Sequence, residues 1–128
     1  MQKSNQAFTL FELLLVMSLL SILIALTLPS YHHLLRQHYR YQTEITLLQM
    51  VNNLEDYADK HASYDATLAD IIPSHSSSLP YRFQLQADAI TFQLRAIPIG
   101  NQSRDTCGEL MIDHLGFKTA QLANCWAE

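Results

Sequence analysis

The sequence predicts an α+β fold in which one long N-terminal helix packs against a small antiparallel sheet. Two features of the 128 residues lead to this prediction. An apolar run from Phe8 to Pro29 passes into a helical pattern that continues to about His61. Farther along, short segments alternate between apolar and polar residues, which is typical of strands with one buried and one solvated face. A chain of this length can hold one membrane helix and one small domain.

The apolar run has the length and composition of a membrane-spanning helix. Residues 8–28 would form a helix of about 31 Å, which matches the roughly 30 Å hydrocarbon core of a bilayer. Glu12 is the one ionised side chain in the run, and a carboxylate at that depth costs on the order of 2.5–3.5 kcal/mol. The sequence therefore predicts that Glu12 is functional and has a partner. Pro29 lacks a backbone donor and predicts a kink where the run ends.

The helical pattern of residues 39–61 is not interrupted by Gly or Pro. Its apolar residues recur at steps of three or four, which predicts the face that packs on the sheet. These residues are Tyr41, Ile45, Leu48, Val51, Leu54 and Ala58. The histidines between residues 32 and 38 lack the spacing that would place two of them on one helical face. We interpret them as part of a polar collar at the membrane surface, and we expect no metal site and no cofactor.

Two hairpins are predicted after a connecting loop at residues 62–79. The first pairs Tyr81–Gln86 with Ala89–Ala96 through Asp88, and the second pairs Glu109–Asp113 with Phe117–Ala120. Arg82 and Arg95 would then lie on the solvated face of the first hairpin. The loop contains a histidine among serines, but the strand-turn-helix context of a hydrolase nucleophile is missing. We therefore expect that the protein is not an enzyme.

Charge and cysteine content limit the function further. Eight basic residues against twelve acidic ones argue against a general nucleic-acid-binding surface. The two cysteines, Cys107 and Cys125, lie far C-terminal to the apolar run. In a domain beyond a membrane such a pair predicts a disulfide in an oxidising compartment. Two buried free thiols are the alternative.

The N-terminal 29 residues resemble the processing and assembly motif of type IV pilins. A short polar leader ends at Ala7 and is followed by Phe-Thr-Leu-Phe-Glu-Leu and the apolar run. The resemblance implies that a prepilin peptidase cleaves between Ala7, where the family usually has Gly, and Phe8. It also implies that Phe8 is then N-methylated and that Glu12 is the glutamate required for assembly. The amine of Phe8 in a neighbouring subunit would supply the cation that a buried carboxylate needs. Pilins also have a proline at the place of Pro29.

The C-terminal third carries a second resemblance. Residues 96–102, 105–110, 113–118 and 125–126 are similar to the tail of one group of pilins, which includes minor pilins of the PilE-like type and competence pilins. This resemblance implies a disulfide between Cys107 and Cys125. The resemblances at both ends imply three parts of the chain: a leader peptide at residues 1–7, a transmembrane and assembly helix at 8–29, and a globular domain at 30–128 that includes the second half of the helix.

A pilin of this kind is a structural, minor subunit of a bacterial type IV pilus, and its fold is a long helix packed on a small antiparallel sheet. Its implied partners are other pilin subunits, the prepilin peptidase, the inner-membrane assembly machinery and the membrane. The precursor would cross the inner membrane once, with a cytoplasmic N-terminus and a periplasmic domain, before it enters an extracellular filament. Adhesion, twitching motility and competence are roles that such pili serve.

Two alternative functions stay open at this point. One is a competence pilin that acts as a DNA receptor, for which Arg82, Arg95, Arg104 and Lys118 are available but are offset by acids. The other is a pseudopilin of a type II secretion system, which shares the N-terminal motif. The cysteine pair argues against the second alternative, because pseudopilins commonly lack such a bridge.

Overall fold

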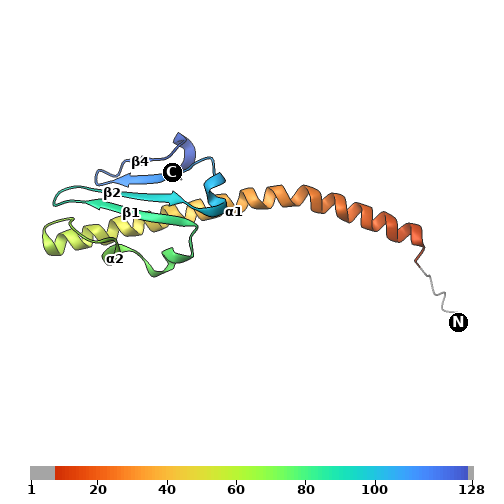
Figure 1. Ribbon diagram of the computed structural model, residues 1–128, viewed down its shortest axis with the longest axis horizontal. Helices are drawn as coiled ribbons and strands as arrows, with labels where there is room; N and C mark the ends of the chain where they lie inside the picture. The colour runs from red at the N-terminus through yellow and green to blue at the C-terminus, as the bar shows by residue number, and fades with distance from the viewer. Residues whose placement is uncertain (1–7, 127–128) are drawn as a thin grey trace. The chain divides into compact units, whose positions relative to one another are not determined.

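The computed structural model describes residues 8–126, so the predicted cleavage site at Ala7 lies outside the described residues (Figure 1). It contains the expected long helix and a four-stranded antiparallel sheet, and the predicted α+β fold is confirmed. The chain divides into two compact units between Leu35 and Arg36. The elements are α1 (Leu10–His61), α2 (Leu68–Ile71), β1 (Tyr81–Ala87), β2 (Phe92–Pro98), β3 (Leu110–Asp113) and β4 (Lys118–Thr119), with 3-10 turns η1 (Ser74–Ser78), η2 (Gly100–Arg104) and η3 (Ala123–Cys125).

In the first unit, the apolar side chains of α1 are exposed along the whole segment that the sequence assigns to the membrane. By length and composition alone, this helix could cross a membrane. Its hydroxyl groups are satisfied within the helix, because Ser18, Ser21 and Thr27 donate to carbonyl oxygens three residues back at 2.8, 2.8 and 3.0 Å. Such a helix brings few unpaired polar groups into a bilayer. The helix continues through Pro29, and the kink there stays a prediction.

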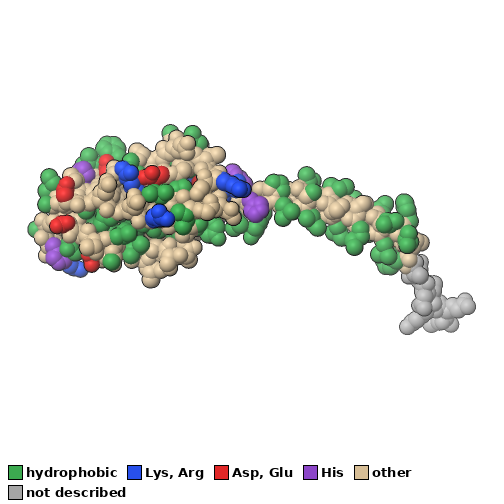
Figure 2. All heavy atoms as spheres, viewed as in Figure 1, with side chains coloured by type: hydrophobic (Ala, Val, Ile, Leu, Met, Phe, Trp, Pro, Cys, Tyr) green, Lys and Arg blue, Asp and Glu red, His purple; other side chains and the backbone are tan. Residues whose placement is uncertain are grey.

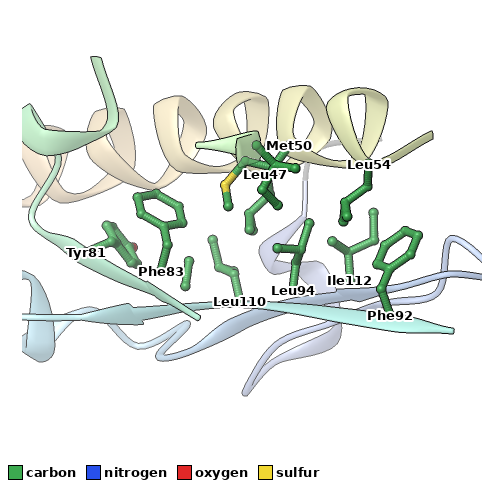
Figure 3. Packing of buried hydrophobic residues seen from close by; sticks show 11 residues of the cluster. Leu47, Met50, Leu54, Tyr81, Phe83, Phe92, Leu94, Leu110 and Ile112 are labelled. Atoms are coloured by element: carbon green, nitrogen blue, oxygen red, sulfur yellow. The ribbon is translucent and has the colours of Figure 1, made fainter. Parts of the chain in front are cut away.

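In the second unit, the sheet has the order β1-β2-β3-β4, so each strand pairs with the one before it. Leu94 of β2 lies between Leu85 of β1 and Ile112 of β3 in the register. Figure 3 shows side chains of α1 pointing toward those of the sheet, where they form one buried cluster. This core consists of Leu47, Met50, Leu54, Ile71, Tyr81, Phe83, Phe92, Leu94, Ala96, Leu110 and Ile112.

The prediction of which side of the helix packs on the sheet was wrong. Of the six residues expected on it only Leu54 is fully buried, whereas Tyr41 and Leu48 are exposed. The buried face is instead formed by Thr43, Glu44, Thr46, Leu47, Met50 and Leu54. The hydroxyls of Thr43 and Thr46 donate to the carbonyls of Tyr39 and Gln42 at 2.7 and 2.8 Å, so burial leaves them with partners. A pattern drawn only through apolar residues could not include these threonines.

The first hairpin is confirmed, but its turn is longer than predicted. β2 begins at Phe92 rather than Ala89, and Ile90, which was expected to be buried, is 75% exposed. The cause is Asp88, whose carboxylate accepts hydrogen bonds from the backbone of Ile90 and Thr91 at 2.9 and 2.8 Å. An aspartate that caps its own turn in this way removes the following residues from the strand. The second hairpin is confirmed with shorter strands than expected.

Candidate functional site

The N-terminal motif places Thr9 and Glu12 at the start of α1. The backbone N–H of Glu12 donates to Oγ1 of Thr9 at 3.2 Å, so Thr9 caps the first turn. The spacing of Thr9 and Glu12 is that of a capping box. Within residues 8–126, no side chain forms a hydrogen bond or an ion pair with the Glu12 carboxylate, which is exposed on the apolar segment. The chain therefore leaves this carboxylate available for a partner on another molecule.

A buried ion pair joins α1 to the segment after η2. Arg40 donates from Nε and Nη2 to the two carboxylate oxygens of Asp105 at 2.9 and 2.6 Å. The side chain of Asp105 is 3% exposed and that of Arg40 is 15% exposed. The hydrogen bond to Asp105 raises the pKa of Arg40, which favours the charged guanidinium. Nothing in the sequence indicated this pair, because its members are 65 residues apart.

Gln102 of η2 is a further buried polar residue in this part of the domain. Its side-chain amide is buried and donates to the hydroxyl of Tyr81 at 2.9 Å and to the carbonyl of Arg36 at 3.0 Å. Burial raises the pKa of Tyr81 to about 12, so the fold stabilises the neutral phenol. The contribution of Tyr81 to the free energy of unfolding is present below the ordinary pKa of about 10. It is lost as the pH rises through about 12. These hydrogen bonds and the Arg40–Asp105 pair hold η2 against the helix.

A disulfide closes the C-terminal segment. Cys107 and Cys125 are bonded, with a Cα–Cα distance of 5.6 Å and a sequence separation of 18. Next to the bridge, Nε1 of Trp126 donates to the carbonyl of Thr119 at 3.0 Å. The bridge and this hydrogen bond hold the segment from Cys125 to Trp126 close to β4, which has only two residues.

We expect that Cys107→Ser with Cys125→Ser lowers the free energy of unfolding by roughly 3 kcal/mol, because the unfolded chain loses the constraint of a closed loop. Residues beyond Asp113 should also become sensitive to protease, since β4 is too short to hold them alone. Chemical denaturation and limited proteolysis of the full chain in a non-ionic detergent measure both effects. Reduced wild-type protein is the control and should behave like the variant. An unchanged, protease-resistant tail would contradict this prediction.

The solvated side of the first hairpin presents a run of side chains that we call the ribbon face: Arg82, Gln84 and Gln86 of β1, and Gln93 and Arg95 of β2. In the register Gln84 lies opposite Arg95, and Gln86 lies opposite Gln93. The three β1 residues are exposed, and the side chain of Arg95 is 36% exposed. The prediction that Arg82 and Arg95 lie on the solvated face is therefore confirmed.

The ribbon face is locally basic although the chain is acidic overall. Neither β1 nor β2 contains an acidic residue. Arg95 is oriented by Gln93, whose Oε1 accepts from its Nε and Nη2 at 3.1 and 2.9 Å. The one acid that pairs with it among the described residues is Glu109, whose Oε1 lies 3.6 Å from Nε. Figure 2 shows acidic and basic side chains next to each other over the domain, so the absence of acids holds for the two strands and not for their surroundings.

The two other cations named from the sequence lie outside the ribbon face. Arg104 ends η2 and is exposed. Lys118 lies in β4, with its Nζ 5.5 Å from the centre of the Trp126 ring. The structure therefore brings Arg82 and Arg95 together on one hairpin, and places Arg104 and Lys118 on separate elements.

Comparisons with known proteins identify type IV pilins as similar to this chain. A family model described as "Type IV minor pilin ComP, DNA uptake sequence receptor" matches residues 29–111, and one described as "Prokaryotic N-terminal methylation motif" matches residues 2–28. Among solved structures, a type IV pilin from Shewanella oneidensis is similar, with a TM-score of 0.59 and 29% sequence identity. That match covers 73% of this chain and 99% of the other. No curated protein matches the chain.

Proposed function

Because the chain belongs to the ComP family of type IV minor pilins, we propose that it is a pilus subunit whose globular domain binds double-stranded DNA. The family description, which names a DNA uptake sequence receptor, carries this proposal. The ribbon face supports it, because the exposed Arg82 and the half-buried Arg95 lie there and neither strand contains an acidic residue. DNA binding thus becomes the main hypothesis, where the sequence alone left it as an alternative.

The N-terminal motif supports a proposed maturation path. A prepilin peptidase would cleave between Ala7 and Phe8 and the new terminus would be methylated, which agrees with the methylation motif at residues 2–28. The leader would be cytoplasmic and the domain periplasmic, where the Cys107–Cys125 disulfide can persist. After processing, the subunit would leave the inner membrane for the filament.

The apolar half of α1 is the proposed assembly element. Its exposed apolar side chains would be buried among the helices of other subunits, and burial of apolar area is the main favourable term in such association. The Glu12 carboxylate, which has no partner within the described chain, would pair with the amine of Phe8 on a neighbouring subunit. We propose that this pair sets the axial register of the subunits.

Salt-dependent DNA binding tests the proposed function. The full chain in a non-ionic detergent should retard a random-sequence duplex in a gel, and the affinity should fall as salt rises. Arg82→Gln and Arg95→Gln should each weaken binding, and each should reduce the slope of log K against log salt by about 0.9 for every phosphate that the variant no longer neutralises. Glu109→Gln should strengthen binding, because it removes the acid beside Arg95.

Lys60→Gln provides a matched control, since Lys60 is an exposed cation in the last turn of α1 and away from the ribbon face. Its loss should leave both the affinity and the salt slope nearly unchanged. Absence of DNA binding by the wild-type chain at low salt would refute the proposed function. Equal losses in all three cation variants would place the DNA elsewhere on the domain.

A further inference from the structure

One apolar repeat of α1 has no partner in its own domain. Tyr41, Ile45 and Leu48 recur at steps of four and three residues, yet Tyr41 is 54% exposed, Leu48 is 40% exposed and Ile45 is half-buried. The residues that pack on the sheet, such as Leu47 and Met50, lie on the other side of the helix and point toward the strands (Figure 3). The repeat found in the sequence therefore exists, but it faces away from the core.

This outer side of α1 also lacks exposed charges. Within residues 41–54 the one Asp, Glu, Lys, Arg or His is Glu44, which is buried. A helix face that stays in water normally carries charged residues, and the next turns of α1 do so with Glu55, Asp56 and Asp59. The uncharged side is thus bounded, and its composition indicates contact with another apolar surface rather than with water.

The repeat has the spacing of a two-stranded coiled coil. In a heptad abcdefg, the d positions are Tyr41 and Leu48 and the a positions are Ile45 and Asn52; we call these four residues the outer seam. A β-branched residue at a with leucine at d favours parallel pairs, and a single asparagine at a fixes the register and the number of strands. Within residues 8–126 the Asn52 amide forms no hydrogen bond, so it is available to the same amide of a second helix. The outer seam ends there, because the following d and a positions carry acids, and like charges would face each other.

The outer seam is short, which limits where it can act. Residues 41–52 form about 18 Å of helix, and a helix is about 10–12 Å wide, so a pair would bury roughly 400 Å² over both partners. Stable complexes in solution bury about 1,200–2,000 Å². A contact of this size needs a second link that holds the partners together and raises their effective concentration. Two precursors that share one membrane meet this condition, and they enter it in the same orientation.

We propose that two copies of the precursor pair in the membrane through the outer seam, as a short parallel coiled coil. This inference rests on the membrane anchoring proposed above and adds a partner at the stage before assembly. Asn52 binds Asn52 of the second copy, which excludes shifted registers and larger bundles. A second copy fits this side of α1, because an uncharged seam does not repel itself and offers no counter-charge to an acidic or basic partner.

Disulfide cross-linking in vesicles tests this inference. The full chain is inserted in phosphatidylcholine vesicles, where no assembly machinery is present to form a filament, and a mild oxidant is added. Leu48→Cys places one thiol of each copy at a d position, within reach of a disulfide. Lys60→Cys is the matched control, at an exposed position of α1 outside the outer seam. Leu48→Cys should form covalent dimers at least roughly tenfold faster than Lys60→Cys, because only its thiols are held together.

A second substitution tests the outer seam by charge. Asn52→Asp in the Leu48→Cys chain places two carboxylates opposite each other, and like charges that face each other disfavour a contact strongly. The rate of cross-linking should therefore fall at least roughly tenfold. Lys60→Asp in the same chain adds a carboxylate outside the outer seam and should leave the rate nearly unchanged. Circular dichroism of each variant checks that the fold is retained.

The outcomes separate this inference from the proposed function. Resistance to carbonate extraction measures insertion. If the chain inserts and Leu48→Cys cross-links no faster than Lys60→Cys, the inference is overturned and the membrane-anchored pilin stands. Cross-linking that is unchanged by Asn52→Asp would overturn the inference as well, because the two Asn52 positions would then not meet. Failure of the wild-type chain to insert would overturn both the proposed anchoring and the inference.

Discussion

Replacement of Asp105 by alanine is expected to lower the free energy of unfolding of the globular domain by about 3–5 kcal/mol. The variant leaves the Arg40 guanidinium in a site where its side chain is only 15% exposed and where the two hydrogen bonds to Asp105 can no longer form. Breaking one half of a buried pair is costly because the remaining charge is desolvated and uncompensated. Chemical denaturation of the full chain in detergent, followed by circular dichroism, measures the decrease.

Two further variants make this result interpretable. The double replacement Arg40→Met with Asp105→Leu removes both charges, and it should recover most of the stability because apolar residues can replace a buried pair at little cost. Asp56→Ala, at an exposed position of α1, should change the stability by less than about 0.5 kcal/mol. If Asp105→Ala were as mild as Asp56→Ala, the pair would not hold η2 to the helix.

Glu12→Gln is expected to reduce incorporation into filaments by at least roughly tenfold, with normal insertion in the membrane. The amide has nearly the same shape as the carboxylate, so only the charge is removed, and the Thr9 cap on the Glu12 backbone N–H is retained. Insertion should not suffer, because a neutral side chain costs less than a carboxylate in an apolar layer. Assembly should suffer because truncating one member of a desolvated charge pair costs about 2–5 kcal/mol. Immunoblots of sheared pili and of the membrane fraction measure both quantities.

The matched control for this variant is Thr9→Ala, which removes the helix cap and keeps the charge. It should weaken the first helical turn by about 1 kcal/mol and leave most of the assembly intact. Glu12→Gln at native abundance in sheared pili would show that the Glu12 charge is dispensable. A stronger defect in Thr9→Ala than in Glu12→Gln would instead assign the motif a role in starting the helix.

The elements with a repeating pattern could be predicted from the sequence, and those that depend on side-chain hydrogen bonds could not. The length of α1 and the existence of both hairpins followed from periodicity alone. The buried helix face did not. The predicted face passed through Tyr41 and Leu48, but Leu47 and Met50 are buried instead. Thr43 and Thr46 are buried beside them with their hydroxyls bonded to the backbone. The start of β2 was misplaced for a similar reason, since Asp88 caps the turn through its own carboxylate.

The candidate DNA surface was predicted in part. Alternation along the first hairpin already placed Arg82 and Arg95 on its solvated side. The orientation of Arg95 by Gln93 follows the same alternation but needs side-chain positions to be seen. The ion pair with Glu109 depends on the pairing of β2 with β3, in which Arg95 lies opposite Met111. The overall charge does not describe this hairpin, because neither β1 nor β2 contains an acidic residue.

The position of β1 at one edge of the sheet has a consequence for aggregation. An edge strand offers backbone groups to any other strand, and glutamine side chains favour ladders between identical segments. In an in-register stack of β1 segments, Arg82 would lie next to its own copies, and the repulsion between these charges opposes stacking. The same arginine that is assigned to DNA attraction thereby keeps free subunits apart. Sedimentation of the Arg82→Gln protein is therefore a necessary part of its DNA-binding assay, because removal of this charge leaves a seven-residue edge strand without any ionised side chain.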